Sequence, residues 1–223
     1  MKASRAPAQR LTVRNVLIVD DHEVVRDGVK NILSEQQTGP FSFGEASTEP
    51  EALRLVSEQN WDVVILDLSL AGRNGLELLK QLKQIQPKLP VLILSMHSED
   101  QYARRAFKAG AAGYVTKDSS RAELVEAVQR VLNGGRYISA DLAESLIVGL
   151  ERDADRPLHA DLSDREFEVM CLIASGKSVV QIAELLSLSD KTISTYRARI
   201  LEKMGMKTNA QLMHYAIQRK LVD

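Results

Sequence analysis

Trp61-Asp-Val-Val-Ile-Leu-Asp67, followed by Leu-Ser-Leu-Ala-Gly-Arg-Asn-Gly75, is the stretch of sequence that decides the fold. Residues 63–66 are apolar and largely β-branched, which is typical of a strand buried on both faces of a parallel sheet. The strand ends at a single carboxylate, Asp67, and a polar loop with two glycines follows. Because ligands of open α/β sheets bind at the carboxyl ends of the strands, Asp67 stands where a reactive group is expected.

Three further apolar runs end in side chains that bind ions. The runs and the residues that follow or close them are 16–19 with Asp20 and Asp21, 91–94 with Ser95, and 113–116 with Lys117. Three carboxylates that meet at one sheet edge repel one another unless a cation lies between them. The pattern therefore predicts a site for a hard divalent ion such as Mg²⁺, with the ammonium of Lys117 placed to hold an incoming anion.

Amphipathic helical patterns alternate with these strands. We expect helices at about 24–33, 49–59, 75–86, 99–109 and 121–132, and a weaker strand at 41–46. A glutamate three residues after Thr48 and after Ser120 predicts a capping box at each helix start. Five strands alternating with helices predict an α/β domain, built on a five-stranded doubly wound parallel sheet, over residues 14–135.

The rest of the chain has a different character. Residues 136–160 include the charged, proline-containing run 151–157, which predicts an interdomain linker with a possible short helix at 140–150. Residues 161–223 are wholly helical in pattern, and Ser163, Ser178 and Thr208 each begin a capping box. A short helix, a tight turn and a longer basic helix at 190–204 predict a small all-α helix-turn-helix bundle.

Bulk composition sets few limits on function. The 223 residues are 44% hydrophobic and 26% charged with a net charge of −1, so no bulk signal favours nucleic acid or membrane. Cys171 is the single cysteine, which excludes an intrachain disulfide and indicates a reducing cytosol and a packing role. No stretch approaches the ~20 apolar residues of a membrane span, and residues 1–14 lack the apolar core of a secretory signal.

The polar residues at the strand ends resemble those of a known family. In order and spacing, the following set resembles the receiver domain of two-component response regulators: Asp20, Asp21, Asp67, Ser95, Tyr114 and Lys117. The resemblance covers about the first 135 residues and implies a flavodoxin-like fold. It implies that Asp67 accepts a phosphoryl group from a sensor histidine kinase.

The same resemblance implies roles for the neighbouring residues. Mg²⁺ would be held by the carboxylates of Asp20, Asp21 and Asp67 and by the backbone carbonyl of Ser69. Lys117 would pair with the phosphoryl oxygens as a point charge. Ser95 and Tyr114 would form a switch, in which the serine hydroxyl binds the phosphate and the tyrosine turns inward. The expected switch residues are therefore Ser95, Tyr114 and Lys117.

The helical segment resembles a second family. The stretches 162–169, 182–189, 191–193 and 203–205 resemble the LuxR-type DNA-binding domain. A receiver followed by such a domain is the NarL/FixJ class of response regulator. The expected function is therefore phosphorylation-controlled transcription regulation in the cytoplasm, by a homodimer that binds inverted repeats in double-stranded DNA.

Specific residues follow from this second resemblance. The expected DNA contacts, which face away from the apolar side of the longer helix or flank it, are Lys191, Thr192, Ser194, Thr195, Arg197, Ala198 and Lys203. The expected dimerisation residues, on the last helix, are Ala210, Met213 and Ile217. We expect the two domains to contact each other and to mask the recognition helix until Asp67 is phosphorylated.

Plainer interpretations stand beside these. Singly, Asp21 fits a helix N-cap, Ser95 a surface hydroxyl, Lys117 a solvated lysine, and the last-helix residues plain core. Three other functional classes are open: a phosphorylation-independent regulator whose receiver only dimerises, a phosphohydrolase with an aspartyl nucleophile, and a ligand-sensing LuxR-type activator. Against the phosphohydrolase, the position two residues after Asp67 is Ser69 and not a second aspartate.

Overall fold

A parallel sheet in the strand order β2-β1-β3-β4-β5 forms the centre of the first domain. The strands are β1 (Arg14–Val19), β2 (Phe41–Ala46), β3 (Val63–Leu66), β4 (Val91–Ser95) and β5 (Gly113–Thr116). The structure is a computed structural model, and it describes residues 13–35, 40–70, 74–96, 99–139, 142–144, 157–219 and 221–222. The sheet confirms the predicted strands, including the weaker one at 41–46.

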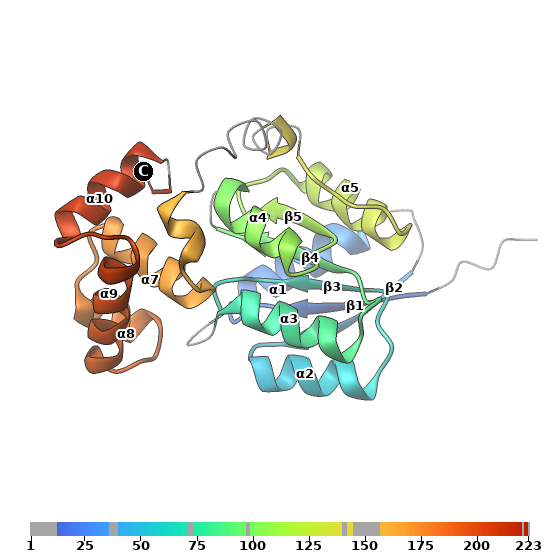
Figure 1. The fold of residues 1–223 in the computed structure, drawn as a ribbon. Coiled ribbons are helices and arrows are strands. Elements are labelled where there is room, and N and C mark those ends of the chain that lie inside the picture. Colours follow the sequence, from blue (N-terminus) through green and yellow to red (C-terminus); the bar gives the residue numbers. More distant parts are fainter. Residues whose placement is uncertain are drawn as a thin grey trace, which may run out of the picture.

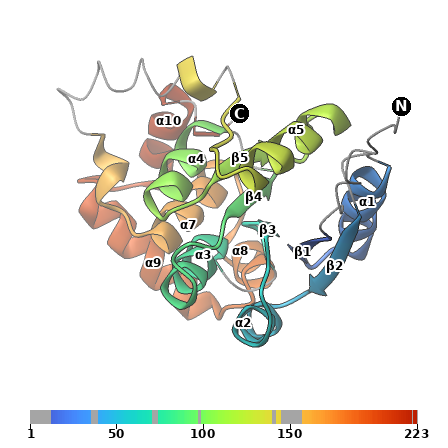
Figure 2. The ribbon, with the colours of Figure 1, turned by 90° about the vertical axis from the view of Figure 1, so that its right-hand side faces the viewer.

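Helices cover both faces of this sheet. They are α1 (Glu23–Ser34), α2 (Glu49–Glu58), α3 (Gly75–Ile85), α4 (Glu99–Lys108) and α5 (Arg121–Leu132). Figure 2 shows α1 and α5 on one side of the strands and α2, α3 and α4 on the other. This arrangement confirms the predicted doubly wound α/β fold, because the alternation of strand and helix places helices on both sides.

The register of the strands brings the polar residues to one edge. All four residues of β3 are buried, with alternate side chains in the two apolar layers. β3 pairs with β1 so that Leu66 lies opposite Val19. The amide of Asp67 then donates to the Val19 carbonyl at 2.9 Å, and the amide of Lys117 donates to the Ser95 carbonyl at 2.8 Å. Neighbouring strands therefore end at the same level, with their polar residues side by side.

The second domain is a small helical bundle. Its elements are the 3₁₀ helix η1 (Leu158–Asp161), α7 (Asp164–Ala174), α8 (Val179–Leu185), α9 (Asp190–Lys203) and α10 (Asn209–Gln218). Apolar side chains from several helices fill its core, among them Phe167, Ile182, Ile193, Ile200 and Leu212, all 0% exposed. The short α8 and the longer α9 form the predicted helix-turn-helix.

The helix starts test the capping predictions one by one. Ser163, Ser178 and Thr208 each form the predicted capping box, and the Ser120 side chain accepts from the Glu123 amide. The prediction at Thr48 is wrong, because its side chain makes no capping hydrogen bond. The carboxylate of Glu51 instead accepts from the amide and hydroxyl of Ser47, at 2.8 and 3.0 Å. Glu51 therefore receives two hydrogen bonds from Ser47, the residue before the expected N-cap Thr48.

Both ends of the expected linker are folded. Tyr137 forms a parallel bridge with Gly113 and is 5% exposed against the first domain. The 3₁₀ helix at the other end carries the buried His159. The expected short helix at 140–150 lies mostly outside the described residues, as does most of the charged run 151–157. The domain limits of 14–135 and 161–223 stay predictions.

The two domains lie against each other, with α7 next to α3 and α4 (Figure 1). One apolar cluster runs from the α2–α4 layer into the helical bundle and includes Leu68, Tyr102, Phe167 and Cys171. Burial raises the pKa of the Cys171 thiol to about 12, which agrees with its expected packing role. None of the helices in the described part of the chain has the length and apolar character that crossing a bilayer requires.

Candidate functional site

The carboxyl edge of the sheet holds an acidic pocket around one ammonium. Asp20 and Asp67 are each only 2% exposed. The Lys117 Nζ atom lies 2.7 Å from Asp20 Oδ2 and 2.7 Å from Asp67 Oδ2. The side chain of Lys117 is 11% exposed, so the alternative of a solvated lysine is wrong. The ends of β1, β3 and β5 thus contribute to one ion-paired cluster. This confirms the prediction that their polar residues meet at one edge of the sheet.

Burial and charge compete in this cluster. Burial raises the pKa of Asp67 above its usual value, although the hydrogen bond from Lys117 opposes this effect. Burial alone would lower the pKa of Lys117, but its hydrogen bonds to Asp20 and Asp67 and their negative charge raise it. The ammonium therefore stays charged at neutral pH. It is held in place by the two carboxylates that it neutralises.

The donor atoms suit a hard divalent cation. Oxygen or nitrogen atoms of Asp20, Asp21, His22 and Asp67 all lie within 4.8 Å of one another. Carboxylate oxygens in this number are the ligands that Mg²⁺ prefers. The Nδ1 atom of His22 lies 2.9 Å from Asp21 Oδ1, and sequence reasoning missed this histidine. Its only signal was its position directly after the two aspartates.

The N-cap interpretation of Asp21 is not supported by the helix start. The N-cap residue of α1 is His22, and its side chain makes no capping bond. The amide of His22 donates instead to Asp20 Oδ1 at 2.8 Å, which orients one of the buried carboxylates. Asp21 keeps a partly exposed side chain at the mouth of the acidic cluster.

The two remaining switch residues lie inside the domain. Ser95 ends β4 and Tyr114 lies on β5, and both are 0% exposed. The alternative of a surface hydroxyl for Ser95 is therefore wrong. Ser95 is the last residue of β4, and α4 begins at Glu99. The switch roles themselves stay predictions.

The loop after β3 is fixed close to the pocket. The Ser69 amide donates to Asp67 Oδ1 at 2.9 Å, which sets the orientation of the carboxylate. The Gly75 amide donates to the Leu68 carbonyl at 3.1 Å. A Cβ atom at Gly75 would lie 2.4 Å from the Leu68 Cα atom and 2.8 Å from the Asp67 carbonyl oxygen. The first residue of α3 can thus reach this position only without a side chain.

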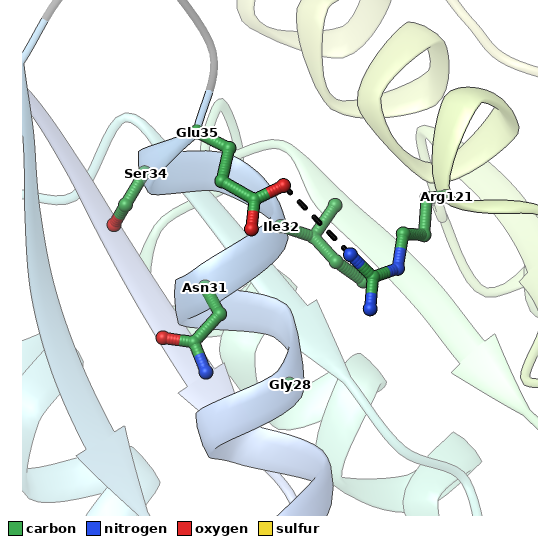
Figure 3. Close-up of a pocket in the computed structure, with 6 residues that line it drawn as sticks. All are labelled: Gly28, Asn31, Ile32, Ser34, Glu35 and Arg121. Carbon is green, nitrogen blue, oxygen red and sulfur yellow. Dashed lines mark ion pairs between the residues drawn. The ribbon is translucent and has the colours of Figure 1, made fainter.

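We expect Gly75→Ala to lower the free energy of unfolding by roughly 1–3 kcal/mol, because backbone must move to admit the methyl group. The matched control is Gly28→Ala in α1, where nothing lies within 4 Å of an added Cβ. Gly28 lines an open surface hollow between α1 and α5, beside the ion pair of Glu35 and Arg121 (Figure 3).

The control should be stabilised by about 0.5–1 kcal/mol, since alanine favours a helix interior over glycine. Urea denaturation of both variants measures the difference. Equal stabilities would contradict the close approach at Gly75.

Two known protein families match this chain, one in each of its two domains. The model of the response regulator receiver domain matches residues 16–129, and the model of the luxR family of bacterial regulatory proteins matches residues 160–216. The chain is a response regulator. It belongs to the NarL/FixJ type, and the receiver match excludes the alternative of a ligand-sensing LuxR-type activator.

Similar response regulators cover nearly the full length of the chain. UvrY of Escherichia coli (strain K12) is 36% identical over 210 residues, which is 94% of this chain and 96% of UvrY. GacA of Pseudomonas aeruginosa is 36% identical, over 93% of this chain and 97% of GacA. A LuxR-family response regulator from Aurantimonas sp. SI85-9A1 matches 65% of this chain and 100% of its own, with 35% identity and a TM-score of 0.57.

RcsB from Salmonella enterica serovar Typhimurium has been solved on promoter DNA in the presence of the phosphomimetic BeF₃⁻. That structure is 25% identical to this response regulator, with a TM-score of 0.56, and covers 91% of this chain and 97% of its own.

The recognition helix α9 presents an open face in this response regulator. Of the seven predicted DNA contacts on α9, five are exposed: Lys191, Ser194, Thr195, Ala198 and Lys203. Thr192 and Arg197 are half-buried. The side chains on the open face are mostly small, so a DNA groove edge could approach the helix backbone closely. Their roles as DNA contacts stay predictions.

Two predicted DNA contacts are engaged within the protein. The Nε atom of Arg197 donates to Asn209 Oδ1 at 2.6 Å and so ties α9 to the start of α10. The Nζ atom of Lys203 lies 2.6 Å from Glu166 Oε2, on the buried carboxylate of the α7 capping box. Sequence patterns place these side chains on a helix face but do not show partners on other helices.

The predicted dimerisation residues lie on α10. Ala210 and Ile217 are exposed, with Ile217 at 56%, and Met213 is half-buried. The opposite side of α10 packs inward through Leu212 and Ala216, each 0% exposed. The interpretation of Ile217 as plain core is therefore wrong. Dimerisation through this face stays a prediction.

The domain contact differs from the expected arrangement. The domains do touch, but through η1 and α7, while the outer faces of α9 and α10 are open (Figure 1). The expectation that the receiver masks the recognition helix is therefore wrong for this structure. The carbonyls of His159 and Leu162 and the carboxylates of Asp164 and Glu168 make the contact instead.

Proposed function

We propose that this response regulator is switched by transfer of a phosphoryl group to Asp67 from a phosphohistidine of a sensor kinase. The observation that carries the proposal is the ion-paired cluster of Asp20, Asp67 and Lys117, with Asp21 at its mouth. An anionic phosphoryl group cannot approach this carboxylate unless positive charge compensates both partners. Lys117 supplies one such charge at 2.7 Å from the attacking oxygen.

The carboxylates of Asp20, Asp21 and Asp67, with the backbone carbonyl of Ser69, would hold Mg²⁺. The ion would neutralise the negative charge that develops during transfer. The Ser69 amide orients Asp67 Oδ1, which leaves Oδ2, the oxygen that pairs with Lys117, to attack phosphorus. Ser95 and Tyr114 would then respond to the new phosphate as the switch.

Phosphorylation would favour a homodimer that binds an inverted repeat of double-stranded DNA in the cytoplasm. The open face of α9 supports the DNA contact, and the exposed Ile217 supports a partner surface on α10. A two-fold dimer doubles the buried surface and matches two half-sites one helical turn apart. The similar RcsB, solved on promoter DNA in the presence of a phosphomimetic, supports a link between phosphorylation and DNA binding.

The test is a selection of genomic DNA fragments by purified protein treated with acetyl phosphate and Mg²⁺, beside Asp67→Asn treated in the same way. We expect only the wild type to enrich a shared inverted repeat. Equal enrichment by both proteins would indicate the phosphorylation-independent alternative. Enrichment by neither would contradict the DNA-binding role, and sustained hydrolysis of a phosphate monoester would favour the phosphohydrolase.

A further inference from the structure

The recognition helix α9 has one line of side chains that lies directly opposite its buried side. Ile193 and Ile200, both 0% exposed, define the buried side. Four exposed residues, spaced by four, three and four positions, form the opposite line: Lys191, Thr195, Ala198 and Glu202. When a recognition helix enters the major groove of DNA, the base edges approach the side that faces away from the core. This line is therefore the part of α9 that meets the bases first.

The middle of this line presents methyl groups. The Oγ1 atom of Thr195 donates to the Lys191 carbonyl at 2.9 Å, so the hydroxyl proton is used within the helix. The other heavy atom on the Cβ of Thr195 is a methyl carbon. Ala198, one turn further along the exposed line, also ends in a methyl group. Two apolar groups thus stand side by side where a polar reading surface was expected.

The charged residues of α9 frame these methyl groups without replacing them. Arg197 and Lys203, which could otherwise bind guanine, are held by Asn209 and Glu166, each at 2.6 Å. The exposed carboxylate of Glu202 lies at the far end of the line and repels phosphates. Close contact with the bases is therefore favoured over the first half of the helix, where the two methyl groups lie.

One base carries a matching group in the major groove. The C5-methyl group of thymine is the apolar feature of that groove, and alanine and threonine methyl groups pack against it. Residues three positions apart on a helix differ by about 4.5 Å along its axis, and neighbouring base pairs are separated by about 3.4 Å. The methyl groups of Thr195 and Ala198 therefore suit thymines in neighbouring base pairs.

We infer that α9 recognises thymine through its C5-methyl group, with Thr195 and Ala198 as the specificity-determining residues at neighbouring base pairs. The inference rests on the proposed DNA binding and names the base chemistry that this site reads. The competing explanation is that the Thr195 oxygen accepts a hydrogen bond from the amino group of adenine or cytosine. The two explanations assign opposite effects to the methyl and the hydroxyl group of this one side chain.

The test uses the full chain, treated with acetyl phosphate and Mg²⁺, and a pool of DNA duplexes with a random centre of about two helical turns. We expect the enriched duplexes to share thymines in neighbouring base pairs. Replacing either thymine by uracil, which lacks only the methyl group, should weaken binding roughly 3- to 5-fold, as expected for one methyl group left unburied. At the same positions, 5-methylcytosine should bind more tightly than cytosine.

Two conservative variants assign the effect to one protein group. Thr195→Ser keeps the hydroxyl and removes the methyl group, so it should bind the thymine duplex roughly 3- to 5-fold more weakly. It should also become insensitive to uracil at one position and stay sensitive at the other, which Ala198 contacts. Thr195→Val keeps a methyl group and should retain both the affinity and the uracil effect. Thr48→Ser, at an exposed threonine before α2 in the receiver, is the matched control and should behave as wild type.

The outcomes distinguish the inference from the proposed function. If the wild type enriches a shared sequence but binds its thymine and uracil forms equally, the inference is wrong and the proposed DNA binding stands. Weak binding by Thr195→Val together with unchanged binding by Thr195→Ser would assign the contact to the hydroxyl group and would also overturn the inference. If no duplex is enriched by the phosphorylated wild type, the proposed function fails first.

Discussion

Asp67→Asn should lower phosphate incorporation from acetyl phosphate by at least about 100-fold, to the background of the assay. The amide is nearly isosteric with the carboxylate but lacks the anionic oxygen that attacks phosphorus. The two hydrogen bonds that position the side chain, from the Ser69 amide and Lys117, go to separate oxygens. The substitution therefore removes the reactive anion. Its amide oxygen can still accept from the Ser69 amide, whereas its amide nitrogen is a donor and loses the pairing with Lys117. Intact-mass spectrometry with peptide mapping measures the incorporation.

Asp27→Asn is the control for loss of one negative charge in the same domain. Asp27 lies on α1 and pairs with Lys30 at the surface, at 2.8 Å. This variant should accept phosphate at the wild-type rate. Phosphate found on another residue of Asp67→Asn, at a rate near that of the wild type, would show that a different side chain is the acceptor.

Lys117→Ala is the second change with a large expected effect. Asp20 and Asp67 would lose the cation that lies 2.7 Å from each, and two buried carboxylates would face each other. Removing one partner of a buried ion pair costs about 3–5 kcal/mol. We expect the lower end, about 3 kcal/mol, because the mouth of the cluster is open at Asp21 and His22. The melting temperature should fall by roughly 6–12 °C for a chain of this size.

Addition of Mg²⁺ should restore most of that loss, since a divalent cation can compensate the same carboxylates. The shift with Mg²⁺ should be larger in Lys117→Ala than in the wild type, where the ammonium competes for Asp20 and Asp67. Lys88→Ala, an exposed lysine after α3, should match the wild type with and without the ion. Equal Mg²⁺ shifts in all three proteins would show that Lys117 does not share the cation site.

The sheet and the acidic cluster could be predicted because their signals are local. Each strand is a short apolar run, and parallel strands end at a common edge, so Asp20, Asp67 and Lys117 had to meet. The capping boxes of the second domain are equally local and are confirmed at Ser163 and Thr208.

The residues that sequence reasoning missed depend on contacts between distant segments. Arg105 lies 59 residues from Asp164, and nothing in its own helix distinguishes it from the exposed Lys108. Arg197 was expected on the DNA-reading face, but its partner is Asn209 on the next helix. Helical periodicity gives the direction of a side chain and not the element packed against it. For the same reason, the side of the bundle that faces the receiver could not be foreseen.

The apolar layer shared by the two domains also affects how the chain is made. The receiver is complete on the ribosome once β5 and α5 have been translated, whereas Phe167 and the helix that carries it follow later. During that interval Tyr102, 7% exposed in the finished molecule, lacks the Phe167 ring against which it packs. We therefore expect the receiver to expose the apolar surface around Tyr102 during synthesis, until α7 has been translated and covers it.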